Sequence, residues 1–260
     1  MRVCQEKVKF FGHVLTNEGL KPDPDKTSAI INMPSPKDKK DTLRFLGLVT
    51  YVSKFIPNMS AVTEPLRRVT HIKANFEWRA EQEEALKKLK KLITETPVLQ
   101  YYNAKKPVVI QTDASSFALG CTLLQDDHPI IYASKTLTPT QRNYAQIEKE
   151  MLAVLFACKR FDQYICGRKN VTIETDHSPL VNIFGKSLLK TPKRLQSMIL
   201  ALQRYNFNIK YTKGSEMYMA DTLSRAPCQL EKSLDIYNIE KELEQLNECS
   251  DVEEKRICLT

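Results

Sequence analysis

Between residues 108 and 211, short apolar runs and amphipathic helices follow one another in an order that few folds can accommodate. Three apolar runs come first, separated by polar links of hairpin length, and this predicts three antiparallel strands. A long helix is expected from Pro139 through Ile165, because apolar residues recur there at steps of three and four. Two more strands with short helices between them complete an α/β fold, a mixed five-stranded sheet with flanking helices. The expected strands are residues 108–113, 118–124, 130–135, 171–176 and 207–211.

The first hundred residues are expected to be mainly helical. Residues 7–20 predict only two short strands around a glycine-containing turn. Asp23, followed by proline, is a suitable cap for a short helix, and Asp38 or Asp41 can cap the next one. A further amphipathic helix is expected over residues 81–93, with glutamates near its start and lysines farther along.

Charge is distributed unevenly along the chain. Residues 228–260 hold four Lys or Arg against nine Asp or Glu, leaving 35 against 22 in residues 1–227, so the body carries +13 and the tail −5. A basic body favours a polyanionic partner such as nucleic acid. No apolar run has the length of a membrane span and the N-terminus lacks the pattern of a signal peptide. We therefore expect a protein that is not secreted and has no membrane partner, located in the cytoplasm, in a virus-like particle or in the nucleus.

Four carboxylates fall on elements that can converge. Asp113 and Asp176 each stand at the carboxyl end of an apolar run, where side chains emerge at the sheet edge. Either aspartate alone also fits an ordinary cap of the next element. Glu150 lies at the boundary of the apolar face of the long helix, and Glu148, about 200° around that helix, is expected to face solvent instead. Asp221, in a predicted final helix, can approach the same edge.

Such a cluster has a direct chemical interpretation. Several carboxylates in one place repel one another unless cations neutralise them. Hard carboxylate oxygens select Mg²⁺ or Mn²⁺. The sequence therefore predicts a divalent metal site built by Asp113, Glu150, Asp176 and Asp221.

The segments around these carboxylates resemble, in order, the ribonuclease H motifs of gypsy-type long-terminal-repeat retrotransposon polyproteins. The segments are Thr112-Asp113-Ala114-Ser115, residues 148–154 (EKEMLAV), residues 175–180 (TDHSPL) and residues 220–225 (ADTLSR). Upstream, residues 10–15 (FFGHVL) resemble the primer-grip hairpin of the reverse transcriptase, and residues 43–48, 55–56 and 64–66 resemble its thumb. The resemblance covers residues 3–227. It implies a primer-grip remnant at 1–20, a thumb-like helical region at 21–75, a connection helix at 76–104, an RNase H domain at 105–227 and an acidic tail at 228–260.

The resemblance also implies an activity. Two Mg²⁺ or Mn²⁺ ions, about 3.5–4 Å apart in such sites, would support in-line hydrolysis of the RNA strand of an RNA–DNA hybrid. Asp113 would bridge both ions, Glu150 and Asp176 would complete the site on the leaving-group side, and Asp221 would hold the ion that activates water. Other Pol-derived subunits are candidate partners.

Two departures from the family pattern matter. Many ribonucleases H have a mobile histidine ten residues before the last aspartate, where this chain has Tyr211. The palm with its paired polymerase aspartates is expected to lie outside this sequence, so this chain alone should not polymerise DNA.

Additional substrate contacts are expected from Tyr211, Phe11, Gly12, His13, Lys87 and Lys91.

Two other hypotheses about the function remain open at this point. The chain could be an inactive or truncated retrotransposon remnant that serves at most as a nucleic-acid-binding scaffold. It could also be a binding module without chemistry, which would explain the basic body but not the carboxylates.

Overall fold

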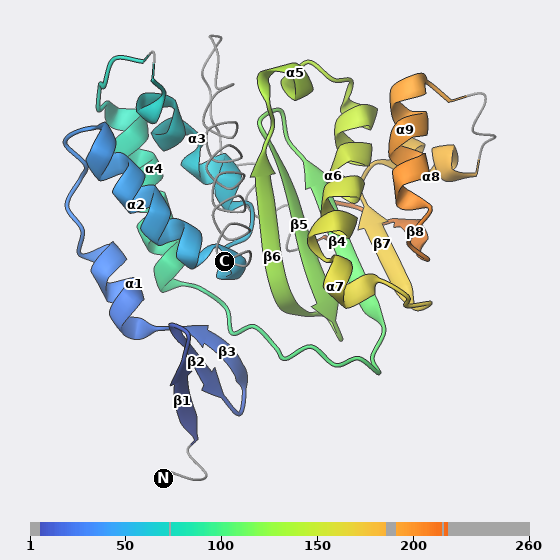
Figure 1. The fold of residues 1–260 in the computed structure, drawn as a ribbon, viewed down its shortest axis with the longest axis horizontal. Coiled ribbons are helices and arrows are strands. Elements are labelled where there is room, and N and C mark those ends of the chain that lie inside the picture. The colour runs from blue at the N-terminus through green and yellow to red at the C-terminus, as the bar shows by residue number, and fades with distance from the viewer. Residues whose placement is uncertain (1–5, 73, 186–190, 215, 218–260) are drawn as a thin grey trace, which may run out of the picture.

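The computed structural model describes residues 6–72, 74–185, 191–214 and 216–217. A small sheet comes first, then a group of helices, then a larger sheet with its own helices (Figure 1). We call helices α1 to α4 the helical unit, and strands β4 to β8 the main sheet.

The small sheet has three strands, not the two expected. They are β1 (Lys7–Phe10), β2 (His13–Thr16) and β3 (Gly19–Pro22), joined in antiparallel order. The sequence analysis did not predict the second change of chain direction, between β2 and β3. There the Thr16 hydroxyl donates to the Gly19 carbonyl (2.9 Å), and Gly19 takes a positive φ of 144° that suits glycine.

The helical unit begins at the expected caps. The Asp23 side chain accepts from the Asp25 amide (3.1 Å), and the Asp38 side chain accepts from the Asp41 amide (2.7 Å). One helix, α3, was not predicted from the residue pattern. It starts after Asn58, which has a φ of +47°, and it contains Pro65. The elements are α1 (Pro24–Ile31), α2 (Lys39–Tyr51), a 3₁₀ turn (Ser53–Phe55), α3 (Met59–Thr70) and α4 (Ala80–Thr94).

The main sheet is mixed and has five strands, as the sequence predicted, and their order in space is β6-β5-β4-β7-β8. Strands β4, β5 and β6 are antiparallel neighbours, whereas β7 runs parallel to both β4 and β8. The tight turn between β5 and β6 contains Asp126 and Asp127, both with positive φ. The strands are β4 (Val108–Ala114), β5 (Ala118–Gln125), β6 (His128–Thr136), β7 (Val171–Thr175) and β8 (Asn208–Tyr211).

The expected long helix from 139 to 165 is in fact three helices. The Thr138 hydroxyl and the Gln141 side chain form a reciprocal cap that encloses only one short turn. A new helix then starts after Ala145, whose backbone is extended and whose amide donates to the Glu148 side chain (3.0 Å). The pieces are α5 (Pro139–Arg142), α6 (Gln146–Arg160) and α7 (Asp162–Ile165).

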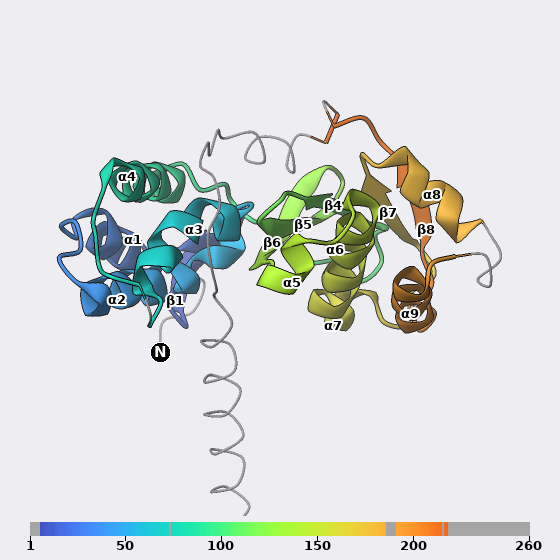
Figure 2. The same ribbon diagram turned by 90° about the horizontal axis from the view of Figure 1, so that it is seen from above.

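Different elements cover the two faces of the main sheet. Val108 and Ile110 of β4 belong to the core formed with α6 and α9 (Lys193–Leu202), and Figure 2 shows these two helices on one side of the sheet. The opposite face of β6 meets the helical unit, because Tyr132 lies in the same buried cluster as residues of α2, α3 and α4. The helical unit and the main sheet therefore share a core. The remaining helix, α8 (Ser178–Phe184), lies against β8.

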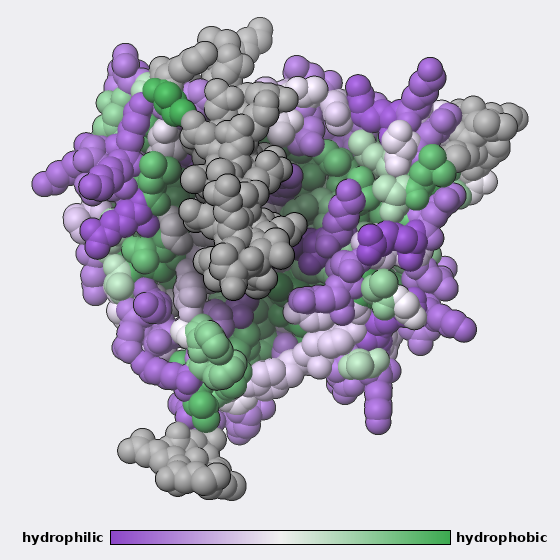
Figure 3. Space-filling view, in the orientation of Figure 1, coloured by the Kyte–Doolittle hydropathy of each residue, from purple (hydrophilic) through white to green (hydrophobic). Residues whose placement is uncertain are grey.

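The surface of the helical unit is mainly hydrophilic along its outer margin, at the left of the space-filling view (Figure 3). Within the described ranges, no helix combines the length and the apolar character that a membrane span requires.

Candidate metal centre

Asp113 and Asp176 lie side by side because their strands are parallel. Thr112 of β4 is paired with Thr175 of β7, so the next residue on each strand falls at the same end of the sheet. The Asp113 side chain is partly buried and Asp176 is exposed. Two carboxylates therefore meet at the carboxyl end of the central strand pair.

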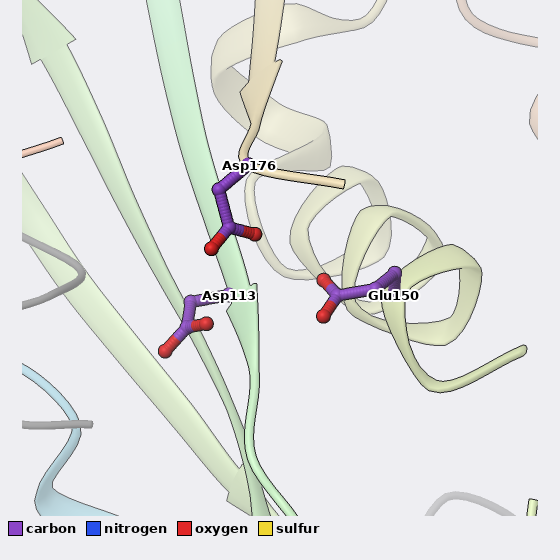
Figure 4. Close-up of side chains that lie close together, drawn as sticks. All are labelled: Asp113, Glu150 and Asp176. Atoms are coloured by element: carbon purple, nitrogen blue, oxygen red, sulfur yellow. The ribbon is translucent and has the colours of Figure 1, made fainter. Parts of the chain in front are cut away.

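Glu150 reaches this pair from the first half of α6. One carboxylate oxygen from each of Asp113, Glu150 and Asp176 lies within 4.8 Å of the other two. Figure 4 shows the Glu150 side chain extending from its helix toward the two aspartates. The structure thus brings together three of the four carboxylates expected at the site.

Gln146, one helical turn before Glu150, holds the Glu150 side chain in place. Its amide nitrogen donates to Glu150 Oε1 (2.6 Å) and to the Ala114 carbonyl (2.9 Å). The second bond ties the start of α6 to the end of β4. Glu150 Oε1 is thereby fixed, while Oε2 is buried and has no hydrogen-bond partner within the described part of the chain.

The environment of Glu150 disfavours its charged form. Burial, together with the negative charges of Asp113 and Asp176, raises the pKa of Glu150 to about 8, although the Gln146 hydrogen bond acts in the opposite direction. Glu150 is only 3% exposed. A buried, ionised carboxylate oxygen without a partner, beside two further carboxylates, is a costly arrangement unless a proton or a metal cation neutralises it.

This donor set fits a divalent cation. All the ligand atoms are carboxylate oxygens, which suit Mg²⁺ and Mn²⁺ better than Zn²⁺ or copper. The unpartnered Glu150 oxygen supplies the specific sign that a positive ligand belongs there. The residues present therefore fit the metal site that the sequence predicted.

Glu148 does not face solvent, so that expectation was wrong. Its side chain is only 13% exposed. It accepts from the Ala145 amide and from Arg194 Nη1, which lies 2.8 and 2.9 Å from its two oxygens. The Arg194 guanidinium also lies over the Tyr144 ring at 4.1 Å. Glu148 is therefore a helix cap and an anchor for α9, a role set by Arg194, which is distant in the sequence.

Of the remaining residues near this edge, Tyr211 can be placed and Asp221 cannot. Tyr211 ends β8 and is paired with Thr175, the residue before Asp176, and its side chain is exposed. Tyr211 thus stands on the strand next to the carboxylates. Asp221, the predicted final helix and the acidic tail lie outside the described residues.

The other expected substrate contacts lie apart from the carboxylates in the sequence and on different elements. Phe11 is 83% exposed at the β1–β2 turn, where Gly12 has a positive φ. Tyr51 holds this turn, because its hydroxyl donates to the Phe11 carbonyl (2.6 Å) and its ring stacks on His13. Burial lowers the pKa of His13.

The two exposed lysines of α4 remain accessible. Lys87 and Lys91 are one helical turn apart and both are exposed, although Lys91 lies 4.0 Å from Glu95. Lys90, in contrast, donates to the Met33 carbonyl within the helical unit.

Sequence reasoning did not find Gln146, although its position four residues before Glu150 is the spacing at which helix side chains meet. It also did not find Arg194, whose contact with Glu148 spans 46 residues and has no local signal.

Comparison with known proteins identifies the class of this domain. Residues 78–173 match the family described as RNase H-like domain found in reverse transcriptase. Two foamy viral protease-reverse transcriptase structures share the fold. One, in complex with RNA/DNA hybrid, has a TM-score of 0.70 at 20% identity and covers 90% of this chain and 32% of that chain. The other, the dRH form in complex with ds DNA, has a TM-score of 0.69 at 21% identity and covers 80% of this chain and 38% of that chain.

The curated relatives that the chain matches are retrotransposon polyproteins. The chain is 40% identical over 223 residues to the Retrovirus-related Pol polyprotein from transposon 297 of Drosophila melanogaster, covering 85% of this chain and 21% of that protein. It is 34% identical over 227 residues to the Transposon Tf2-3 polyprotein of Schizosaccharomyces pombe, covering 85% of this chain and 17% of that protein. The chain therefore corresponds to one segment, about a fifth of the length, of gypsy-type retrotransposon Pol polyproteins, and the resemblance seen in its motifs is confirmed.

Proposed function

We propose that this domain is a ribonuclease H, which hydrolyses the RNA strand of an RNA–DNA hybrid with the help of two Mg²⁺ or Mn²⁺ ions. The observation that supports this best is the group of three carboxylates within 4.8 Å, one of which keeps an unpartnered buried oxygen. Divalent ions bound there would promote attack by water and stabilise the departing 3′ oxygen. The products would carry a 5′-phosphate and a 3′-hydroxyl.

The chain's own residues have distinct proposed roles. Asp113, Glu150 and Asp176 would hold the metal ions, with Asp221 as a fourth ligand from beyond the described residues. Gln146 would keep the Glu150 carboxylate directed toward the two aspartates, since it is bonded both to Glu150 and to the end of β4. A fixed ligand loses less conformational freedom when a metal binds.

RNA–DNA hybrid is the proposed substrate for two reasons. A hybrid is rich in phosphates and suits the basic body of the chain, and A-form geometry with the 2′-hydroxyl would select its RNA strand. One of the foamy viral structures that share this fold is itself a complex with RNA/DNA hybrid. Phosphate and base contacts would come from Lys87, Lys91 and the Phe11–Gly12–His13 turn, with Tyr211 near the cleavage site.

The wider setting is also a proposal. We assign residues 105–227 to the nuclease and the preceding segments to the end of a polymerase, with other Pol-derived subunits as partners and the cytoplasm, a virus-like particle or the nucleus as the place of action. A catalytically inactive scaffold is the alternative, and the intact Asp113–Glu150–Asp176 group favours the enzyme over it.

One experiment separates these functions. Purified protein is incubated with a hybrid labelled on either strand, in the presence of Mg²⁺, Mn²⁺ or a chelator. We expect metal-dependent cleavage of the RNA strand only. Binding without cleavage would identify the scaffold, whereas equal cutting of the DNA strand or full activity in chelator would exclude a ribonuclease H.

A further inference from the structure

The helical unit touches the main sheet close to the proposed metal site. The first turn of α3 is joined to β6, because the Ser60 amide donates to Ser134 Oγ (2.9 Å) and the Ser134 hydroxyl donates to Ser60 Oγ (3.1 Å). In the pairing of β5 with β6, Ser134 lies opposite Gly120. The start of α3 is therefore fixed over the β5–β6 pair close to the end where β5 begins.

Asn58, the residue just before α3, makes the closest approach. It stands at the N-cap position, where asparagine usually accepts a bond from the helix amides, yet its side chain makes no such bond. Its φ is +47° and only 8% of its surface is exposed. A Cβ atom added to Gly120 would lie 1.7 Å from Asn58 Oδ1. The Asn58 side chain thus occupies the space that any other residue at position 120 would need.

The strand register places this contact beside Asp113. Gly120 lies directly opposite Asp113 in the antiparallel pairing of β4 and β5. Residues directly opposite project from the same face of a sheet, with Cβ positions about 4.5–5.5 Å apart. The Asn58 carboxamide therefore flanks Asp113 on the β5 side, while Asp176 flanks it on the β7 side.

We propose that Asn58 is a positioning residue for the metal site: its side chain fills the β5 side of Asp113 and keeps that carboxylate directed toward Glu150 and Asp176. The inference rests on the proposed function, because it assumes that Asp113 binds metal. Its consequence is that metal affinity depends on the docking of the helical unit, a separate segment of the chain. The helical unit would then contribute to the chemistry as well as to substrate binding.

The test uses the full chain and the variant Asn58→Gly. Glycine accepts the positive φ at this position, so the backbone of α3 can keep its course while the carboxamide is removed. Mn²⁺ affinity is measured by titration calorimetry without substrate, alongside the melting temperature and the rate of hybrid cleavage. We expect Mn²⁺ to bind about tenfold more weakly or worse, as for the loss of other groups that support metal ligands.

Ser60→Ala is the matched control. It removes the bond that the Ser134 hydroxyl of β6 donates to Ser60 Oγ, at the same end of α3, and leaves the bond from the Ser60 amide in place. It should lower the melting temperature while leaving Mn²⁺ affinity unchanged. Unchanged affinity in Asn58→Gly, or an equal loss of affinity in both variants, would overturn the proposal, since the role of Asn58 would then be limited to docking.

A double-mutant cycle tests the contact itself. Gly120→Ala should lower the melting temperature strongly in the unaltered chain, because its methyl group meets the Asn58 side chain, and much less in the Asn58→Gly background. If Gly120→Ala lowers the melting temperature equally with Asn58 present and in Asn58→Gly, the proposed contact between the two residues is contradicted. Failure of the unaltered protein to cleave hybrid would contradict the proposed function. Normal cleavage by the unaltered protein together with unchanged Mn²⁺ affinity in Asn58→Gly would contradict only this inference.

Discussion

Asp113 is the carboxylate whose loss should affect the proposed chemistry most, because it lies between Asp176 and the Asn58–Gly120 contact and faces Glu150. Asp113→Asn is expected to reduce hybrid cleavage by more than the roughly 100-fold that loss of a supporting residue can cost. Hybrid binding should persist. The metal-free protein should melt at a higher temperature, because one of several like charges is gone. Single-turnover cleavage and thermal melting measure these effects.

The control for Asp113→Asn is Asp127→Asn. Asp127 is exposed in the β5–β6 turn with a φ of 58°, a conformation that asparagine also tolerates. This variant loses the same charge and should cleave normally. Near-normal turnover by Asp113→Asn would contradict the site assignment, and so would an equal loss in Asp127→Asn.

The raised pKa of Glu150 predicts a pH dependence of stability. The unfolded carboxyl ionises near its ordinary value of 4.5, whereas the folded one stays protonated until about pH 8. Between these values the folded state holds the extra proton, so the metal-free protein should lose stability as pH rises from about 5 to 8. Glu150→Gln, which cannot ionise, should reduce this loss. Urea unfolding in chelator at several pH values measures the difference, and parallel curves for the two proteins would contradict the assigned pKa.

At the scale of elements, the start of α6 depends on Glu148. This residue caps the helix at Ala145 and anchors Arg194 of α9, so it supports the element that carries Glu150. Glu148→Gln can still accept from the Ala145 amide, whereas Glu148→Ala cannot. We expect Glu148→Ala to be less stable than Glu148→Gln by about 1 kcal/mol, the usual value of a side-chain cap. Equal free energies of unfolding from urea titrations would show that the cap contributes nothing.

The ion pair with Arg194 should contribute less than the cap. The Arg194 side chain is 49% exposed, and solvent screens such a pair to at most about 1 kcal/mol. High salt should therefore reduce the difference in free energy of unfolding between the unaltered chain and Glu148→Gln. If this difference in free energy does not change with salt, the packing of Arg194 on Tyr144 is the contribution that was lost.

At the scale of the whole molecule, the helical unit and the main sheet are expected to unfold together. Tyr132 of β6 is 2% exposed and buried among residues of the helical unit, and Ser134 is bonded to Ser60. Deleting residues 1–104 would expose this face of β6. We expect the remaining fragment to unfold at a lower urea concentration than the full chain. An unchanged midpoint would show that the nuclease part is independent.

Phosphate binding by α4 is better tested within the full chain. Replacing Lys87 and Lys91 with glutamine should reduce the slope of hybrid affinity against salt by about 0.7–0.9 for each phosphate that these lysines neutralise. Lys159→Gln, an exposed position on α6, is the matched control and should leave the slope unchanged. If the slope stays the same in the α4 variant, those lysines only face solvent.

The features that could be predicted from the sequence are those that depend on interactions between residues close along the chain. The succession of five strands along the chain, the caps at Asp23 and Asp38 and the positions of Asp113 and Asp176 at strand ends follow from hydrogen bonds and periodicities between near neighbours. One failure was also local in origin. The break at Ala145 within the expected long helix was not seen, because apolar spacing continues across it.

Most of the elements, and the positions of Asp113 and Asp176 at strand ends, could be predicted from residues close along the chain, because backbone hydrogen bonding and side-chain periodicity depend on near neighbours. The environment of those carboxylates, in contrast, arises from tertiary packing. The pKa of Glu150, the pairing of Glu148 with Arg194 and the approach of Asn58 to Gly120 depend on burial and on contacts between distant segments. Burial and charge act through space, so they were set when the helical unit and α9 packed against their neighbours.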